Sequence, residues 1–89
     1  MLEVILTTAF KKDYKRLSRS GQYIMQYLHE VTEKLVNDIP LDVKYRDHGL
    51  IGGWQDCREC HIKPDWLLIY QFKENDLILV RTGSHSDLF

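Results

Sequence analysis

Two nearly continuous apolar runs, residues 66–72 and 77–82, lie close together in the second half of the chain. The segment between them, Lys73-Glu-Asn-Asp76, is entirely polar. Short polar segments of this kind are typical of a turn between paired strands, and nearly unbroken apolar runs indicate strands that are buried on both faces. The rest of the chain must therefore cover a central pair of strands.

The length of the chain leaves room for one core. With 89 residues, of which 44% are hydrophobic and 28% charged, it has the composition of a single globular domain, which we place at residues 1–89. No apolar run approaches the roughly 20 residues that a membrane-spanning helix needs. The first residues also lack the basic segment of a signal peptide, so we expect a cytoplasmic protein without membrane contact.

The first half has helical periodicity after an initial strand. Residues 2–7 are apolar and β-prone, which favours a strand. From residue 9 to about residue 18, the apolar positions Phe10, Tyr14 and Leu17 have the spacing of an amphipathic helix. A second helix, which ends before Pro40, is indicated by a further stripe: Ile24, Leu28, Val31 and Leu35.

A third strand is predicted ahead of the two apolar runs, at residues 54–62, with a turn at Lys63-Pro-Asp65. The order of elements is then β-α-α-β-β-β. We therefore predict an α+β domain in which an N-terminal strand and a helical hairpin pack on a mainly antiparallel sheet. Because the helices cover one face, polar side chains on the other face are candidates for function.

Alternation along the 54–62 strand separates two pairs of residues. Cys60 and Ile62 lie on one side, and Glu59 and His61 lie on the other. The apolar pair belongs to the core, so we expect Glu59 and His61 side by side on the open face.

Other residues of the same chemistry lie at the ends of the strands: His48, Asp65, Arg81 and His85. Imidazoles and carboxylates transfer protons near neutral pH, and arginine binds phosphate through two nitrogens. A metal-free ribonuclease uses these groups: a base takes the 2′-hydroxyl proton, a cation stabilises the charge on phosphorus, and an acid protonates the leaving 5′-oxygen. Structural alternatives are a surface position for the histidines, a turn for Asp65 and a salt bridge for Arg81.

The two cysteines raise the question of a metal or haem. Cys57-Arg-Glu-Cys60-His61 has the spacing of a haem attachment segment, and the same cysteines with His61 and His85 are a possible zinc set. Haem attachment requires export, and a strand turns the two cysteines to opposite faces. We therefore predict no metal site and no cofactor, with Cys60 in the core and Cys57 a partly exposed thiol.

The first helix is strongly basic although the net charge of the chain is −1. One acid, Asp13, stands among five cations: Lys11, Lys12, Lys15, Arg16 and Arg19. Such a face is either solvated or bound to phosphate. If the substrate is RNA, these residues and two arginines of the second half, Arg46 and Arg58, are the candidates for binding it.

Several segments of the chain resemble a known toxin family. Phe10-Lys-Lys-Asp-Tyr-Lys-Arg-Leu17 is similar to the basic first helix of the YafQ-type toxins of the RelE/ParE superfamily. Tyr45-Arg-Asp-His48-Gly-Leu50-Ile-Gly52-Gly-Trp54 resembles their D-H-x-L-x-G-x-W segment. Two further blocks match most specifically: Arg58-Glu-Cys-His61-Ile-Lys-Pro64-Asp65-Trp66-Leu-Leu-Ile-Tyr70 and Arg81-Thr-Gly-Ser-His85-Ser-Asp-Leu-Phe89.

This resemblance implies a RelE-like fold and the toxin half of a bacterial type II toxin–antitoxin pair. Such a toxin enters the ribosomal A site and cuts mRNA there unless its antitoxin holds it, and the toxin–antitoxin complex binds operator DNA through the antitoxin. The positions that the resemblance implies for the active site are His48, Glu59, Asp65, His85 and Phe89. Glu59 stands where some members have aspartate.

A second function remains open at this point. The chain could be a non-catalytic or ParE-like member that acts through antitoxin binding or on another target. The ParE-like relatives lack the histidines, so His48, His61 and His85 favour the nuclease.

Overall fold

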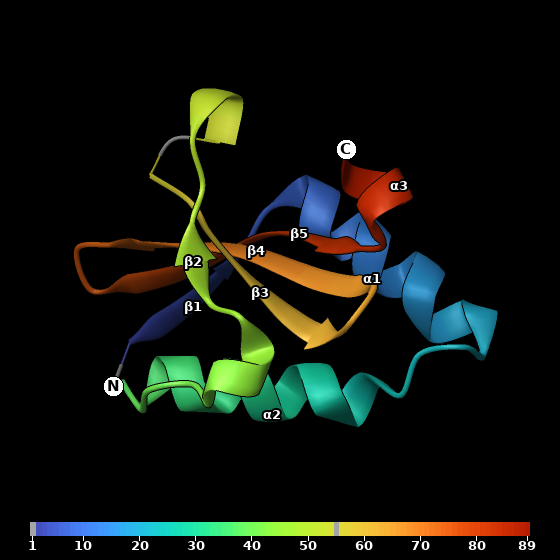
Figure 1. Cartoon of the computed structure of the whole chain (residues 1–89), viewed down its shortest axis with the longest axis horizontal. Helices are drawn as coiled ribbons and strands as arrows, with labels where there is room; N and C mark the ends of the chain where they lie inside the picture. The colour runs from blue at the N-terminus through green and yellow to red at the C-terminus, as the bar shows by residue number, and fades with distance from the viewer. Residues whose placement is uncertain (1, 55) are drawn as a thin grey trace.

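The computed structural model describes residues 2–54 and 56–89, and in them a five-stranded sheet has the order β1-β5-β4-β3-β2 (Figure 1). Strand β1 pairs with β5 in parallel, and the other neighbours are antiparallel. The strands are β1 Glu3–Leu6, β2 His48–Gly49, β3 Arg58–Lys63, β4 Trp66–Lys73 and β5 Asp76–Gly83. The helices are α1 Thr8–Ser20, α2 Met25–Val36 and α3 His85–Leu88, with short 3-10 turns η1 Val43–Tyr45 and η2 Gly52–Trp54.

The helical hairpin forms as its sequence indicates. The Thr7 hydroxyl accepts a hydrogen bond from the Phe10 amide and so caps the start of α1. Gly21, at φ +74°, ends this helix in the left-handed conformation that glycine adopts at low cost. The predicted mainly antiparallel α+β fold is therefore confirmed, and so are both predicted helices.

The main core lies between the helical hairpin and one face of the sheet. Three residues of the α2 stripe, Leu28, Val31 and Leu35, are buried in it. The strands contribute Cys60, Ile62, Trp66, Leu68, Tyr70, Leu77 and Leu79. This arrangement confirms that alternation in β3 sends Cys60 and Ile62 toward the helices.

A smaller core covers part of the opposite face. Helix α3 lies there, on the other side of the sheet from α2 (Figure 1). Leu88 of this helix packs on Leu67 and Ile69 of β4, with Trp54 and Cys57 at the edge. The face that we expected to be open is therefore covered in part.

Three features differ from the sequence-based expectation. The strand predicted at residues 54–62 begins only at Arg58, because Gly52–Trp54 forms a 3-10 turn and Asp56 has φ +71°. Residue 55 of that predicted strand lies outside the described residues. Trp54 packs on the small core instead of extending the strand. Strand β2 and helix α3 were not predicted.

None of the described helices has the length and apolar character needed to cross a membrane.

Candidate active site

Strands β2 and β3 bring the first two site residues together. His48 of β2 lies directly opposite Glu59 of β3 in the antiparallel register. His61 follows two positions after Glu59 and points to the same face, as predicted. We use the name histidine cluster for His48, His61 and His85 together with the carboxylates Glu59 and Asp65.

Backbone carbonyls fix the orientation of two histidines. His48 Nδ1 lies 2.6 Å from the Arg46 oxygen, and His61 Nδ1 lies 3.2 Å from the Pro64 oxygen. A carbonyl oxygen can only accept, so Nδ1 carries the proton in both rings. The other nitrogen of each ring, Nε2, therefore faces the site with either a lone pair or an exchangeable proton.

Glu59 is the meeting point of these two nitrogens. Its Oε1 atom lies 3.5 Å from Nε2 of His48 and 3.3 Å from Nε2 of His61, and the residue is only 5% exposed. A protonated Nε2 of either imidazole can pair with this carboxylate. A buried carboxylate also needs such partners to offset the loss of solvent. The group Glu59–His48–His61 can therefore hold a proton and move it among three atoms.

His85 reaches the cluster from the start of helix α3. The Ser84 hydroxyl accepts from the Asp87 amide, and the Asp87 carboxylate accepts from the Ser84 amide, which forms a capping box. Gly83, at φ +155°, allows the sharp turn into this helix, and a Cβ atom there would lie 2.9 Å from Asp87 Oδ2. The local sequence thus sets the position of His85.

Asp65 holds His85 in a second way. One oxygen, Oδ1, accepts from His85 Nδ1 at 2.9 Å and from the His85 backbone amide at 3.1 Å. The hydrogen bond from the His85 side chain holds the pKa of the Asp65 carboxyl below its usual value. Asp65 is therefore a carboxylate that orients His85, with Nδ1 again the proton-bearing nitrogen. The ring centroids of His61 and His85 are 5.7 Å apart, so the third histidine lies beside His61.

Aromatic rings extend the row of histidines. Phe89 is 61% exposed and lies with its ring centroid 6.5 Å from His85 and 5.7 Å from Trp54. An exposed ring beside a catalytic group can stack on a nucleic-acid base. The implied place of Phe89 in the active site stays a prediction, but the geometry puts its ring next to His85.

Arg81 has a partner that the sequence did not reveal. Its Nε lies 2.6 Å from Asp13 Oδ2, and its second fork nitrogen lies 3.0 Å from Asp13 Oδ1. Asp13 is 2% exposed and also accepts from the Thr82 amide. Burial by itself raises the pKa of Asp13, but the hydrogen bonds from Arg81 and Thr82 outweigh it and hold the pKa below its usual value. The side chain of Arg81 is therefore already bound to a carboxylate. Its contact with phosphate stays a prediction.

The loop before β2 is tied to the sheet by a second polar group. Asp47 accepts from Arg58 Nε at 3.2 Å and from the Tyr70 hydroxyl. The neighbouring Arg46 has φ +50°, a conformation that costs a non-glycine residue energy and that aims its carbonyl at His48. Arg58, predicted to bind RNA, thus also holds the loop that positions His48.

The basic residues of α1 have different surroundings. Lys11, Lys12, Lys15 and Arg19 are exposed. Arg16 lies 3.1 Å from Asp13 and 3.4 Å from Asp87, so it joins α1 to helix α3. The four exposed cations leave a basic face on α1, whereas Arg16 has a structural partner.

The cysteine set considered for zinc does not assemble. Cys60 is fully buried in the main core, where burial raises the pKa of its thiol to about 12, and Cys57 packs at the edge of the small core. A different set does come together: Glu59, His61 and His85 each offer one ligand atom, and these atoms lie within 4.8 Å of one another. Imidazole and carboxylate ligands of this kind suit zinc or copper.

Comparison with known proteins identifies a family for the whole described chain. The family of bacterial YafQ toxins of type II toxin–antitoxin systems matches residues 2–89. The mRNA interferase toxin YafQ of Escherichia coli (strain K12) is 35% identical over 80 residues, which are 90% of this chain and 87% of that protein.

Two crystal structures extend the comparison. A metal-bound toxin from Helicobacter pylori is 48% identical, with a TM-score of 0.92 and complete coverage of both chains. The E. coli DinJ–YafQ complex contains a chain that is 34% identical, with a TM-score of 0.89 over 100% of this chain and 99% of that one. The match runs through α1, the histidine cluster and the C-terminal helix. The chain therefore belongs to the YafQ family of bacterial toxins from type II toxin–antitoxin systems.

Proposed function

We propose that this chain is an mRNA interferase, a toxin that stops translation by cutting mRNA on the ribosome. The name of the E. coli relative supports this activity. The observation that carries the proposal is the arrangement of His48, His61 and His85, each with Nδ1 bound to an acceptor and Nε2 left for proton transfer.

The chemistry follows from these groups. The Glu59–His48–His61 group takes the proton of a 2′-hydroxyl, and the 2′-oxygen attacks the adjacent phosphorus. The bond from phosphorus to the 5′-oxygen breaks, and His85 donates its proton to that oxygen. The products are a 2′,3′-cyclic phosphate and a 5′-hydroxyl. Because His61 lies between His48 and His85, proton acceptor and donor can stand on opposite sides of the reacting phosphate.

The ribosome supplies what the small site lacks. The cluster is largely open, with the side chains of His48 and His85 at least half exposed, so it cannot orient a flexible RNA by itself. Correct orientation contributes several powers of ten to a rate. The basic face of α1 offers contacts for ribosomal phosphates, and the reaction takes place in the cytoplasm, in the A site.

An antitoxin controls the activity. The E. coli YafQ forms a complex with DinJ, and we propose a cognate antitoxin for this chain as well. An acidic segment of that protein would cover His85 and Phe89 or move helix α3, which is only four residues long. The toxin–antitoxin complex would bind operator DNA through the antitoxin.

A metal ion fits the ligand atoms of Glu59, His61 and His85, and the H. pylori relative is described as metal-bound. A zinc or copper ion bound there would supply Lewis acidity. It would also engage the atoms that our mechanism uses for proton transfer. The proposed cleavage therefore needs the three side chains to be metal-free.

The proposal can be tested with purified ribosomes programmed with a defined mRNA. The wild-type toxin should cut the mRNA in the A site and leave 5′-hydroxyl and 2′,3′-cyclic phosphate ends. Free mRNA should be cut far more slowly. Equal rates with and without ribosomes would contradict the ribosome dependence, and 5′-phosphate ends would contradict the chemistry.

A further inference from the structure

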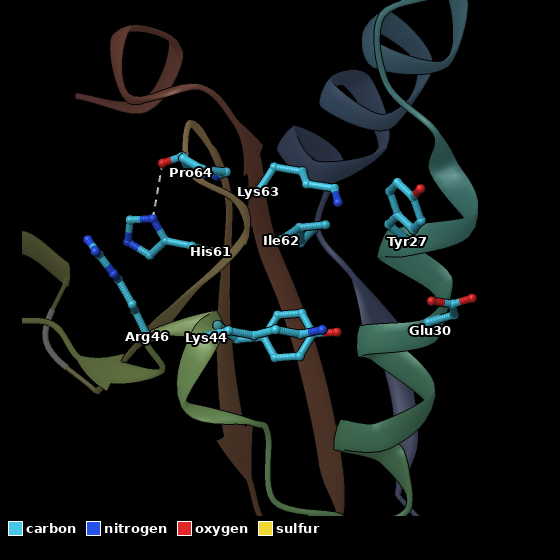
Figure 2. A pocket seen from close by; sticks show the side chains of 9 residues that line it. Tyr27, Glu30, Lys44, Arg46, His61, Ile62, Lys63 and Pro64 are labelled. Atoms are coloured by element: carbon cyan, nitrogen blue, oxygen red, sulfur yellow. Dashed lines mark hydrogen bonds between the residues drawn. The ribbon is translucent and has the colours of Figure 1, made fainter.

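A cavity of about 460 Å³ lies on the side of His61 that faces helix α2 (Figure 2). Its walls come from α2, the η1 turn and the end of strand β3. Tyr27 and Glu30 lie on the α2 side, and Arg46 and His61 lie on the opposite side (Figure 2). Its size is within the range of small-molecule sites. No sequence pattern indicates this cavity, because its three walls are far apart along the chain.

Cations dominate the lining of this cavity. Three basic residues line it, Lys44, Arg46 and Lys63, against one acid, Glu30. The two ammonium groups are held by aromatic rings: Lys63 Nζ lies 4.2 Å from the centre of the Tyr27 ring, and Lys44 Nζ lies 5.2 Å from that of Tyr45. A cation over an aromatic face is attracted by it. The rings therefore reduce the freedom of two flexible lysines before any ligand arrives, which lowers the entropic cost of binding an anion.

The cavity shares residues with the histidine cluster. His61 belongs to both, and its Nε2 contacts Glu59. Arg46 lines the cavity with its side chain, while its carbonyl oxygen holds His48. A polymer that crosses the cluster can therefore enter the cavity without leaving the surface.

We infer that this cavity is a subsite for the RNA strand, which binds the nucleotide next to the cleaved bond. Lys44 and Lys63 bind its phosphate, and Arg46, on the opposite wall, contacts the strand where it leaves the histidine cluster. The inference rests on the proposed cleavage of RNA, because it takes the scissile phosphate to lie at the histidine cluster. RNA is favoured over an acidic antitoxin segment because the cations surround a cavity that continues directly from His61.

The experiment measures binding of a fluorescent short RNA with a 2′-O-methyl group at every sugar, which prevents attack by the 2′-oxygen. The test variant is the double substitution Lys44→Gln and Lys63→Gln, at two exposed positions. The matched control is Lys73→Gln, an exposed lysine at the other end of strand β4. Dissociation constants are measured over a range of salt concentrations.

We expect the double variant to bind this RNA about tenfold more weakly and the slope of log affinity against log salt to fall by about one, because phosphate contacts act through counterion release. The control should bind like wild type. On programmed ribosomes the double variant should need a higher concentration for half-maximal cleavage, with an unchanged rate at saturation.

Wild-type affinity and salt slope in the double variant would overturn the inference, as would an equal loss in the Lys73→Gln control. A double variant that loses affinity for the antitoxin but not for the RNA would also overturn it, because the cavity would then be a protein contact. Failure of the proposed function is a separate result: the wild type would bind the RNA through these lysines and yet cut no mRNA.

Discussion

Strand β3 contributes to both faces of the sheet, and the two faces have different surroundings. Cys60 and Ile62 point into the main core beneath the helical hairpin, where large apolar side chains surround them. Glu59 and His61, from the same strand, point to the opposite face, where one four-residue helix and a small core are the main cover. Side-chain alternation alone thus separates the residues that pack from those that carry the proposed chemistry.

The difference shows how a small domain can keep a polar site. The helix side buries enough apolar surface to stabilise the fold, so the opposite face can leave histidines partly exposed. Glu59, which is buried on that face, lies beside two imidazoles, and the buried Asp13 of helix α1 binds Arg81 and Thr82. We therefore expect substitutions on the two faces to affect different measurements.

The largest effect is expected for His85→Ala. Removal of a positioned general acid costs about 10²- to 10⁴-fold in rate. Because His85 is exposed, its loss should change the free energy of unfolding by no more than about 0.5 kcal/mol. Single-turnover cleavage on programmed ribosomes measures the rate, and urea unfolding measures stability. His29→Ala is the histidine control for the rate: His29 contacts Tyr14 of α1 and lies outside the histidine cluster, so this variant should cut at the wild-type rate. Wild-type cleavage by His85→Ala would move the acid to His48 or His61.

The complementary change on the helix side is Leu28→Ala. Leu28 is 1% exposed in the main core, so the substitution should lower the free energy of unfolding by about 2–5 kcal/mol. The cleavage rate per folded molecule should not change, because Leu28 lies in the main core, on the other side of the sheet from the histidine cluster. Val43→Ala, at an exposed position, is the control for stability. A large rate loss in folded Leu28→Ala would show that the two faces are coupled.

Asp13→Asn tests the polar anchor that joins α1 to β5. The loss of charged hydrogen bonds to Arg81 should cost roughly 2 kcal/mol at neutral pH. Since the pKa of Asp13 is lower in the folded protein, its contribution is fully present above the ordinary value of 3.8 and is lost as the pH falls through the lower folded pKa. The stability of the variant should therefore fall less steeply than that of wild type below this value. Parallel curves from pH 7 to pH 2 would contradict the role of this carboxylate.

The sequence predicted the parts of the molecule that repeat a pattern. The apolar runs predicted β4 and β5, and the helical stripes predicted α1 and α2. In the structure, the bounds of these four elements differ from the predicted ranges by only a few residues. Strand β2 has only two residues, too few for any periodicity, and it depends on the contacts of Asp47 with Arg58 and Tyr70. Helix α3 is equally short, but its capping box, Ser84 with Asp87, was readable in the sequence.

In the site, too, the sequence predicted only what a local pattern or the family resemblance shows. Alternation was enough to place Glu59 beside His61, and the family resemblance implied active-site positions for Asp65 and His85. The pairing of Asp13 with Arg81 joins residues 68 positions apart, which no local pattern shows. One signal was available: Asp13 is the only acid in a basic helix and falls three residues after Phe10, on its apolar side.

Charge reversal on the basic face of α1 should have a moderate effect. Lys11→Glu combined with Lys15→Glu should weaken ribosome binding about tenfold or more and lower its dependence on salt, because fewer counterions are released. The cleavage rate at saturating ribosome should stay close to wild type, since neither lysine lies in the histidine cluster. Sedimentation with ribosomes at several salt concentrations measures the affinity. An unchanged affinity would make this face a solvated surface.

The smallest effect is expected from removal of metal ions. Excess EDTA should leave the cleavage rate unchanged, because the proposed mechanism moves protons between the histidine cluster and the RNA without a bound ion. The double variant Cys57→Ser and Cys60→Ala should also keep its activity per folded molecule, since both thiols pack in the cores and outside the cluster. Magnesium must be restored for the ribosomes, so EDTA treatment and buffer exchange precede the assay, with mock-treated toxin as the control. Glu59, His61 and His85 can nevertheless hold an ion, which makes the result decisive. If chelation abolishes cleavage and zinc restores it, these three residues act as metal ligands, and their role as proton carriers is wrong.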